Sequence, residues 1–234
     1  MGDKESLVLD PTDERMVPES AGMGTFWEHV YRYAFACRFV GGKRVLDIAC
    51  GEGYGSAALQ KTGAANVIGV DVSESTCVHV RNKYGLDAKP GTAEQIPLPD
   101  NSIDVVVSFE TIEHVPDPGR FLDECVRVLA PGGMLVISTP NKEVYSGRLG
   151  TRNRYHCSEM TEEEFASALR ALSRFPFLYP ASRLRGLVES ADARLRQHSM
   201  GTYTRVPASA PSRSKADFPR GHQRAYGRAK SVRS

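Results

Sequence analysis

Short apolar runs alternate with amphipathic stretches through the middle of the chain. Branched apolar residues predict strands at 44–49, 66–71, 103–109 and 133–138, and a further strand is expected at 87–89. The aromatic-rich stretch 26–39 has helical spacing and predicts a helix packed on the sheet, with its rings in the core. The alternative is that Tyr31 or Tyr33 covers a bound ligand. Strands alternating with helices predict an α/β fold with a parallel sheet and right-handed crossovers.

The two ends of the chain lack this pattern. Residues 1–24 are polar and contain prolines and glycines, which predicts a flexible N-terminal arm. Residues 25–174 then form one domain, in which Gly132 and Gly133 are expected to end the last helix as a left-handed C-cap. Residues 175–234 are rich in Arg, Ser, Ala and Pro, and we expect a disordered, low-complexity tail.

Charge is unevenly distributed along the chain. Residues 201–234 contain six Arg and two Lys against one Asp, a net charge of +7. Because the whole chain carries +2, the preceding 200 residues carry −5. The folded part therefore lacks the basic surface typical of nucleic-acid binding, and only the tail offers such a contact.

Cysteine usage and hydropathy bear on location. The five cysteines are scattered without a C-x-x-C pair, which favours reduced thiols over a disulfide or zinc framework. We find no signal peptide at the start and no apolar run of membrane-spanning length. A cytoplasmic location is expected, and the sequence does not indicate an oligomeric state.

A glycine-rich turn follows the first predicted strand. Asp47 lies within this apolar strand, where a carboxylate needs a partner, and Gly51, Gly53 and Gly55 follow. The G-x-G-x-G spacing differs from the G-x-G-x-x-G of nicotinamide enzymes. Asp71, at the end of the second strand, is placed to accept hydrogen bonds from ribose hydroxyls, or alternatively to cap the following helix.

Five ordered motifs extend this pattern, at residues 46–53, 91–100, 102–108, 113–115 and 127–133. They resemble the glycine motif, adenine loop, fourth strand, post-strand turn and helix-to-strand turn of class I S-adenosylmethionine-dependent methyltransferases of the type-11 methyltransferase domain group. The resemblance covers about residues 40–172. It implies a Rossmann-like S-adenosylmethionine-binding methyltransferase domain, here with incomplete or disordered C-terminal edge strands.

The resemblance also implies which residues bind the cofactor. Asp47 would order the glycine turn, Asp71 would hold the ribose, and the adenine would lie near Thr92, where the family commonly has Asp. A hydroxyl can accept the adenine amino group, but without charge assistance. The expected cofactor-binding residues are Asp47, Ala49, Gly51, Gly53, Asp71, Val72, Thr92, Ala93, Glu94 and Glu110.

The segment after the fourth strand has an E-x-x-E-H pattern. Glu110 and Glu113 would share one face of a helical turn beside His114, and His156 follows in a downstream Tyr-His segment. This pattern resembles the magnesium site of ubiquinone-biosynthesis O-methyltransferases and that of small-RNA 2′-O-methyltransferases. Glu110, Glu113, His114 and His156 would then bind Mg²⁺ or Mn²⁺; the alternative is that these residues line the pocket without a metal.

The expected activity is methyl transfer from S-adenosylmethionine to a hydroxyl or amine of a small-molecule, sugar or lipid-linked acceptor. His114 is the first candidate for the general base and His156 the second. The alternatives are a metal-dependent RNA 2′-O-methyltransferase, a protein that binds S-adenosylmethionine without catalysis, and an NAD(P)-dependent oxidoreductase, which the glycine spacing disfavours.

Overall fold

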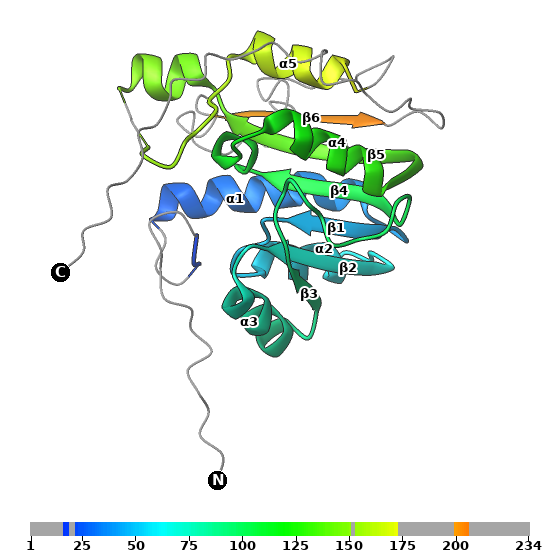
Figure 1. The fold of residues 1–234 in the computed structure, drawn as a ribbon. Coiled ribbons are helices and arrows are strands. Elements are labelled where there is room, and N and C mark those ends of the chain that lie inside the picture. The colour runs from blue at the N-terminus through cyan, green and yellow to red at the C-terminus, as the bar shows by residue number, and fades with distance from the viewer. Residues whose placement is uncertain (1–15, 19–21, 151–152, 173–198, 206–234) are drawn as a thin grey trace, which may run out of the picture.

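A six-stranded sheet forms the centre of the protein (Figure 1). The computed structural model describes residues 16–18, 22–150, 153–172 and 199–205. The strand order is β3-β2-β1-β4-β5-β6, in which the first five strands are parallel and β6 runs antiparallel to β5. The strands are β1 (Arg44–Ile48), β2 (Asn66–Asp71), β3 (Asp87–Pro90), β4 (Ile103–Phe109), β5 (Leu129–Pro140) and β6 (Ser199–Arg205).

Helices cover both faces of this sheet. Helices α1 (Met23–Ala36) and α2 (Tyr54–Lys61) share one apolar core with the sheet, and α4 (Pro118–Val128) and α5 (Glu162–Arg170) share another with the opposite face. Helix α3 (Glu74–Tyr84) packs beside β2 and β3. The short helices are η1 (Cys37–Phe39), η2 (Ile112–His114) and η3 (Glu143–Arg148).

The alternation of side chains along β1 decides where Asp47 lies. Leu46 and Ile48 belong to the core under α4 and α5, whereas Val45 packs with α1 and α2. Successive residues of a strand point to opposite faces, so Asp47 faces α1 and α2 with Val45. A buried carboxylate is thereby placed inside an otherwise apolar layer.

The five predicted strands are confirmed, with boundary differences of a few residues. The predicted glycine C-cap is wrong. Helix α4 ends at Val128, its C-cap Leu129 is extended, and β5 begins there. Gly132 does adopt a left-handed φ of 78°, but within β5, where the chain departs from regular pairing with β4.

The ends of the chain also differ from expectation where they are described. Val17, in the predicted flexible arm, is buried. In the predicted disordered tail, Ser199–Arg205 forms strand β6, so that prediction is corrected for these seven residues. The rest of both segments lies outside the described residues, so these domain limits stay a prediction. Among the helices that are described, none is long and apolar enough to cross a membrane.

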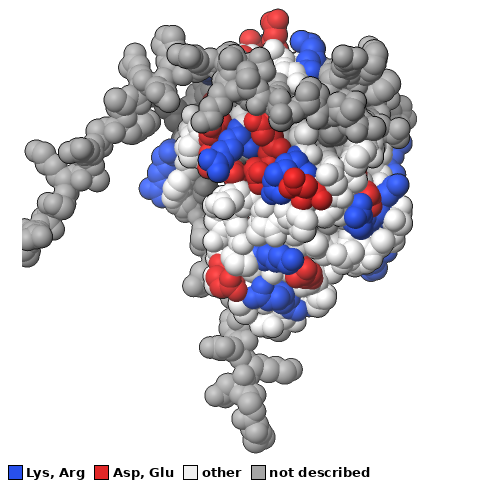
Figure 2. Space-filling model, turned by 45° about the vertical axis from the view of Figure 1, so that its right-hand side comes forward, with Lys and Arg blue, Asp and Glu red and all other residues white. Residues whose placement is uncertain are grey.

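Positive and negative side chains are interspersed on the face shown in Figure 2. Ion pairs join some of the charged side chains of the protein: Arg127 contacts Asp100 at 2.6 Å and Glu124 at 2.7 Å. Its guanidinium also donates to the carbonyls of Ile96 and Leu98, which ties α4 to the preceding loop. This face therefore lacks the one-signed basic surface that nucleic-acid binding favours.

Candidate functional site

The glycine turn between β1 and α2 is built from left-handed residues. Ala49, Gly51 and Gly53 have φ values of 58°, 55° and 95°. A Cβ at Gly53 would lie 2.7 Å from a methyl carbon of Val80, so neither the backbone conformation nor the space suits another residue. The turn lies at the carboxyl end of β1, where open α/β sheets bind ligands.

Asp47 lies beneath this turn and not on its surface. Tyr33 Oη donates to both carboxylate oxygens, at 3.1 and 3.2 Å, and Ser56 Oγ donates at 2.6 Å. The sequence indicates that Asp47 needs a partner but does not identify either donor, because Tyr33 lies on α1, far from Asp47 along the chain. The carboxylate connects α1, β1 and α2, so its position suits the ordering role that the resemblance implies.

Burial raises the pKa of Asp47 to about 7, and the charge of Asp71 adds to the rise. In the unfolded chain this pKa is close to its ordinary value, so between about pH 4 and pH 7 the native state holds a proton that the unfolded state has lost. We therefore expect Asp47 to reduce stability as pH rises through this window, by roughly 1 kcal/mol per pH unit. Denaturant unfolding at several pH values measures this slope.

Asp47→Asn is the variant that isolates this contribution, because it cannot titrate. Its slope should be shallower than that of the unaltered protein. Asp104→Asn is the control: Arg44 holds the pKa of Asp104 at about 2, below the window, so its removal should leave the slope unchanged. Equal slopes for the unaltered protein and Asp47→Asn would contradict the prediction.

Asp71 ends β2 beside the glycine turn. Its Oδ2 accepts the Gly51 amide and its Oδ1 accepts the Ser73 amide, both at 3.0 Å. Ser73 is the N-cap of α3 and accepts the Thr76 amide, so the capping role belongs to Ser73. Each carboxylate oxygen of Asp71 has a further lone pair. Val72, next to it, is 76% exposed.

The residues expected around adenine occupy the loop after β3. Thr92 is exposed, and its carbonyl accepts the Gln95 amide. Ala93 is half-buried against the core. The Glu94 carboxylate accepts the Asp117 amide at 2.9 Å, at the N-cap of α4. Glu94 therefore has a structural contact that sequence analysis did not predict.

Glu110 follows β4 and has a left-handed φ of 51°. Its carboxylate accepts Ser138 Oγ at 2.6 Å and pairs with Arg32 of α1 at 3.2 Å. Because η2 begins only at Ile112, Glu110 precedes the helical turn. The expected shared helical face with Glu113 is therefore wrong.

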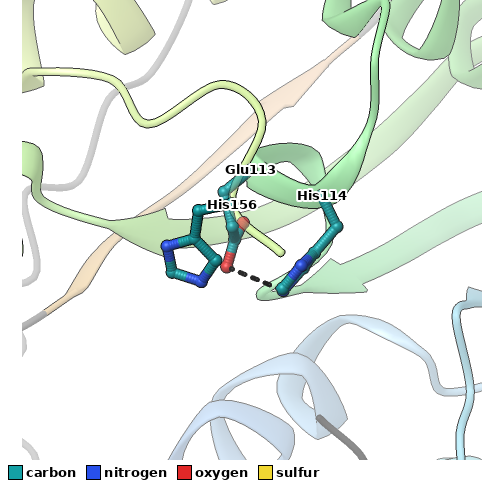
Figure 3. A group of neighbouring side chains, drawn as sticks. All are labelled: Glu113, His114 and His156. Carbon is teal, nitrogen blue, oxygen red and sulfur yellow. Dashed lines mark ion pairs between the residues drawn. The ribbon is translucent and has the colours of Figure 1, made fainter. Parts of the chain in front are cut away.

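Three of the four predicted metal ligands do come together. One ligand atom each from Glu113, His114 and His156 lies within 4.8 Å of the others (Figure 3), and Glu110 is not a member of this group. The loop containing His156 is held there by the backbone, since the Glu113 carbonyl accepts the amides of Cys157 and Ser158 at 2.7 and 3.0 Å. The two imidazole rings meet edge to face, with centroids 4.8 Å apart.

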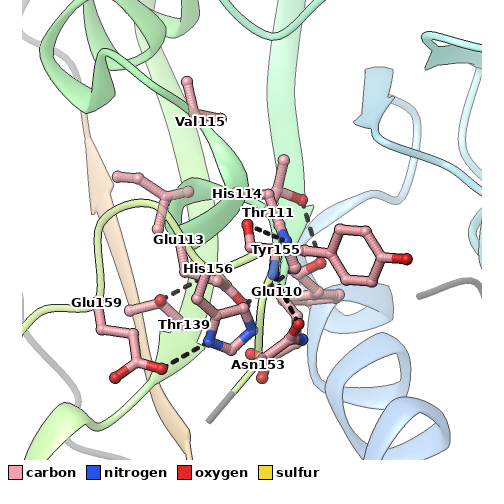
Figure 4. A network of polar contacts seen from close by, with 12 residues as sticks. Glu110, Thr111, Glu113, His114, Val115, Thr139, Asn153, Tyr155, His156 and Glu159 are labelled. Atoms are coloured by element: carbon pink, nitrogen blue, oxygen red, sulfur yellow. Dashed lines mark hydrogen bonds and ion pairs between the residues drawn. The ribbon is translucent and has the colours of Figure 1, made fainter. Parts of the chain in front are cut away.

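Hydrogen bonds orient both imidazoles (Figure 4). His114 Nδ1 lies 3.3 Å from the carbonyl oxygen of Tyr155, and His156 Nδ1 lies 2.7 Å from the carboxylate of Glu159. Both acceptors favour the tautomer with the proton on Nδ1, which leaves Nε2 as the basic nitrogen of each neutral ring.

Glu113 is almost fully buried beside these rings. Its Oε2 accepts Thr139 Oγ1 at 2.9 Å, whereas its buried Oε1 has no hydrogen-bond donor and lies 3.9 Å from His114 Nε2. Burial raises the pKa of Glu113 well above its ordinary value, and the charge of Glu110 raises it further. The carboxylate oxygen and two imidazole nitrogens can thus act on a proton or hold a cation.

Comparison with known proteins identifies the family. The methyltransferase domain family matches residues 46–137. A probable S-adenosylmethionine-dependent methyltransferase of Mycolicibacterium smegmatis is 41% identical over 179 residues, which cover 72% of this chain and 68% of that protein. The chain belongs to the S-adenosylmethionine-dependent methyltransferases. Its cofactor is accordingly S-adenosylmethionine.

Two further relatives match the methyltransferase over a smaller share of their length. A probable S-adenosylmethionine-dependent methyltransferase of Mycobacterium tuberculosis is 39% identical over 69% of this chain, and the chain spans 60% of that relative. A ubiquinone biosynthesis O-methyltransferase of Bradyrhizobium diazoefficiens is 40% identical over 44% of this chain and 42% of its own length.

A solved structure shows the same fold. A putative methyltransferase from Bacillus halodurans superimposes with a TM-score of 0.58 at 18% identity, over 76% of this chain and 98% of that chain. The predicted Rossmann-like α/β methyltransferase fold is therefore confirmed.

Proposed function

We propose that the methyltransferase transfers a methyl group from S-adenosylmethionine to a hydroxyl, or an amine, of a small-molecule, sugar or lipid-linked acceptor. The observation that carries the proposal is the pair of imidazoles at the carboxyl end of β4, oriented by Tyr155 and Glu159. The O-methyltransferase activity in the name of the partly matching Bradyrhizobium relative supports an oxygen acceptor.

In this proposal the cofactor lies across the carboxyl ends of β1 and β2. Ala49, Gly51 and Gly53 present backbone to its methionine moiety, and Asp71 accepts from its ribose. Asp47 acts from beneath by ordering the turn. The adenine contacts are assigned to exposed Val72 and to the Thr92, Ala93 and Glu94 loop, and Glu110 completes this set beside β4.

Methyl transfer from a sulfonium is an in-line displacement, so the enzyme mainly aligns the acceptor with the methyl carbon and excludes water. The acceptor hydroxyl must also lose its proton. His114 is assigned as the general base because its side chain is 27% exposed, against 6% for His156, and it is therefore more accessible to an acceptor. His156 takes the second position.

A divalent cation is a second candidate occupant of the Glu113–His114–His156 group. The buried Oε1 of Glu113 accepts no hydrogen bond from the described residues, which favours a cation beside it. Each imidazole also donates through Nδ1, as metal-binding histidines do. With Glu110 paired to Arg32, the donors are one carboxylate and two imidazoles, which suits Mn²⁺ better than Mg²⁺. Such an ion would lower the pKa of an acceptor hydroxyl.

Calorimetry and a methyl-transfer screen test the proposal together. We expect S-adenosylmethionine and S-adenosylhomocysteine to bind, and NAD not to bind. Labelled S-adenosylmethionine is then offered with phenols, catechols, sugars, amines and short RNA, with and without Mn²⁺. Label on a small hydroxyl or amine compound would support the proposal. Transfer to RNA alone would favour the alternative RNA methyltransferase, and cofactor binding without any transfer would favour a non-catalytic binding protein.

A further inference from the structure

One buried carboxylate of the glycine turn lies against α3. Glu52 is 1% exposed, although it lies between Gly51 and Gly53 in a turn. Burying a carboxylate is unfavourable unless donors surround it, so its position requires specific partners. The residues that contact the Glu52 carboxylate are not among the site residues predicted from the motifs.

Three side chains of α3 contact the Glu52 carboxylate. His79 Nε2 lies 2.8 Å from Oε1, Lys83 Nζ donates to the same oxygen at 2.6 Å, and Tyr84 Oη donates to Oε2 at 2.7 Å. His79 and Tyr84 also pack edge to face, with ring centroids 6.5 Å apart. One turn residue is therefore bound to the last two turns of a single helix.

Strand β2 and helix α3 contact the residues on both sides of Glu52. The Gly51 amide donates to Asp71, just before α3, and the Cys50 amide donates to the Val70 carbonyl. On the other side, Gly53 packs so closely on Val80 that a Cβ would lie 2.7 Å away. The turn is thus held along its whole length by β2 and α3.

We propose that Glu52 is a positioning residue for the cofactor: by binding the glycine turn to α3, it sets the turn's backbone for the methionine moiety of S-adenosylmethionine. This inference rests on the proposed cofactor position. Left-handed residues such as Ala49 are intrinsically strained, so the turn needs an external constraint to keep its conformation. The Glu52–α3 hydrogen bonds supply that constraint without touching the ligand.

The test compares two ligands. Glu52→Gln keeps the side-chain shape but removes the charge, and we expect it to raise the Kd for S-adenosylmethionine about tenfold or more in calorimetry. The Kd for adenosine, which lacks the methionine moiety, should change less than about twofold. General loss of structure would weaken both ligands alike, so the ratio of the two effects reports positioning.

Two further variants keep the test decisive. Tyr84→Phe removes only one donor from a partly exposed position, and it should shift S-adenosylmethionine binding in the same direction by a smaller factor. Glu74→Gln is the matched control, because it breaks an exposed ion pair with Arg81 on the same helix and should change neither ligand. Equal weakening of both ligands, or none, by Glu52→Gln and Tyr84→Phe would overturn the inference. An unaltered protein that binds no S-adenosylmethionine would overturn the proposed function as well.

Discussion

Gly55→Ala is expected to lower the free energy of unfolding by up to about 5 kcal/mol. A Cβ at this position would lie 1.9, 2.2 and 2.3 Å from three ring atoms of Tyr33, so the ring must move. Overpacking of this kind typically costs up to about 3 kcal/mol, and losing the Tyr33 hydrogen bonds to the Asp47 carboxylate costs about 2 kcal/mol more. Urea unfolding measures the change.

Gly24→Ala is the matched control. Gly24 also lies in the first turn of a helix, α1, but among the described residues no atom outside its chain neighbours and the helix backbone lies within 4 Å of a Cβ built there. Alanine favours the helix by about 1 kcal/mol over glycine, so this variant should be as stable as the unaltered protein or slightly more stable. If Gly55→Ala proved as stable as Gly24→Ala, the packing of Tyr33 on α2 would be disproved.

His114→Ala is expected to reduce methyl transfer about 100-fold or more, since a general base contributes a factor of about 10² to 10⁴. His156→Ala should cost less, because His156 supports His114 across the 4.8 Å ring contact and is less accessible to an acceptor. Turnover is measured at saturating S-adenosylmethionine with the acceptor found in the screen.

The relative losses separate the base from the metal. A larger loss for His114→Ala that Mn²⁺ does not change supports the base assignment. Similar losses for both histidine variants, reversed by added Mn²⁺, would instead favour the cation at the Glu113–His114–His156 group. Cys157→Ser is the control in the same loop: its thiol is exposed, so activity should be retained.

Local patterns predicted most of the sheet because β1, β2, β4 and β5 each contain a run of branched apolar residues, which identifies a buried strand without reference to its partners. Strand β6 has no such run. It forms through antiparallel pairing with β5, and this pairing lies outside any local window. The misplaced C-cap has a similar origin, since β5 begins at Leu129, well before its continuous apolar run at 134–137, and includes Gly132 and Gly133.

The sequence likewise located some residues of the candidate site but not the partners that hold them. The motifs located Asp71 and the glycine turn, because residue type alone indicates their roles. Glycines allow a tight turn, and an acid at a strand end can accept hydrogen bonds from a ligand. The partners of Asp47, Glu52 and Glu110 were not identified, since each partner lies on another element. The spacing also predicted that Glu110 would join Glu113, His114 and His156 as a metal ligand. In the structure Glu110 pairs with Arg32 and lies outside this group.

The sequence by itself determined where most of the buried strands lie along the chain, the position of the glycine turn, and the family. Each of these depends on the residue types at neighbouring positions. Only the tertiary structure decided which donors stabilise each buried carboxylate, and which of the acids near His114 meets His156. The physical reason is that a carboxylate in a low-dielectric interior needs donors, but its sequence neighbours do not specify which distant helix or loop supplies them.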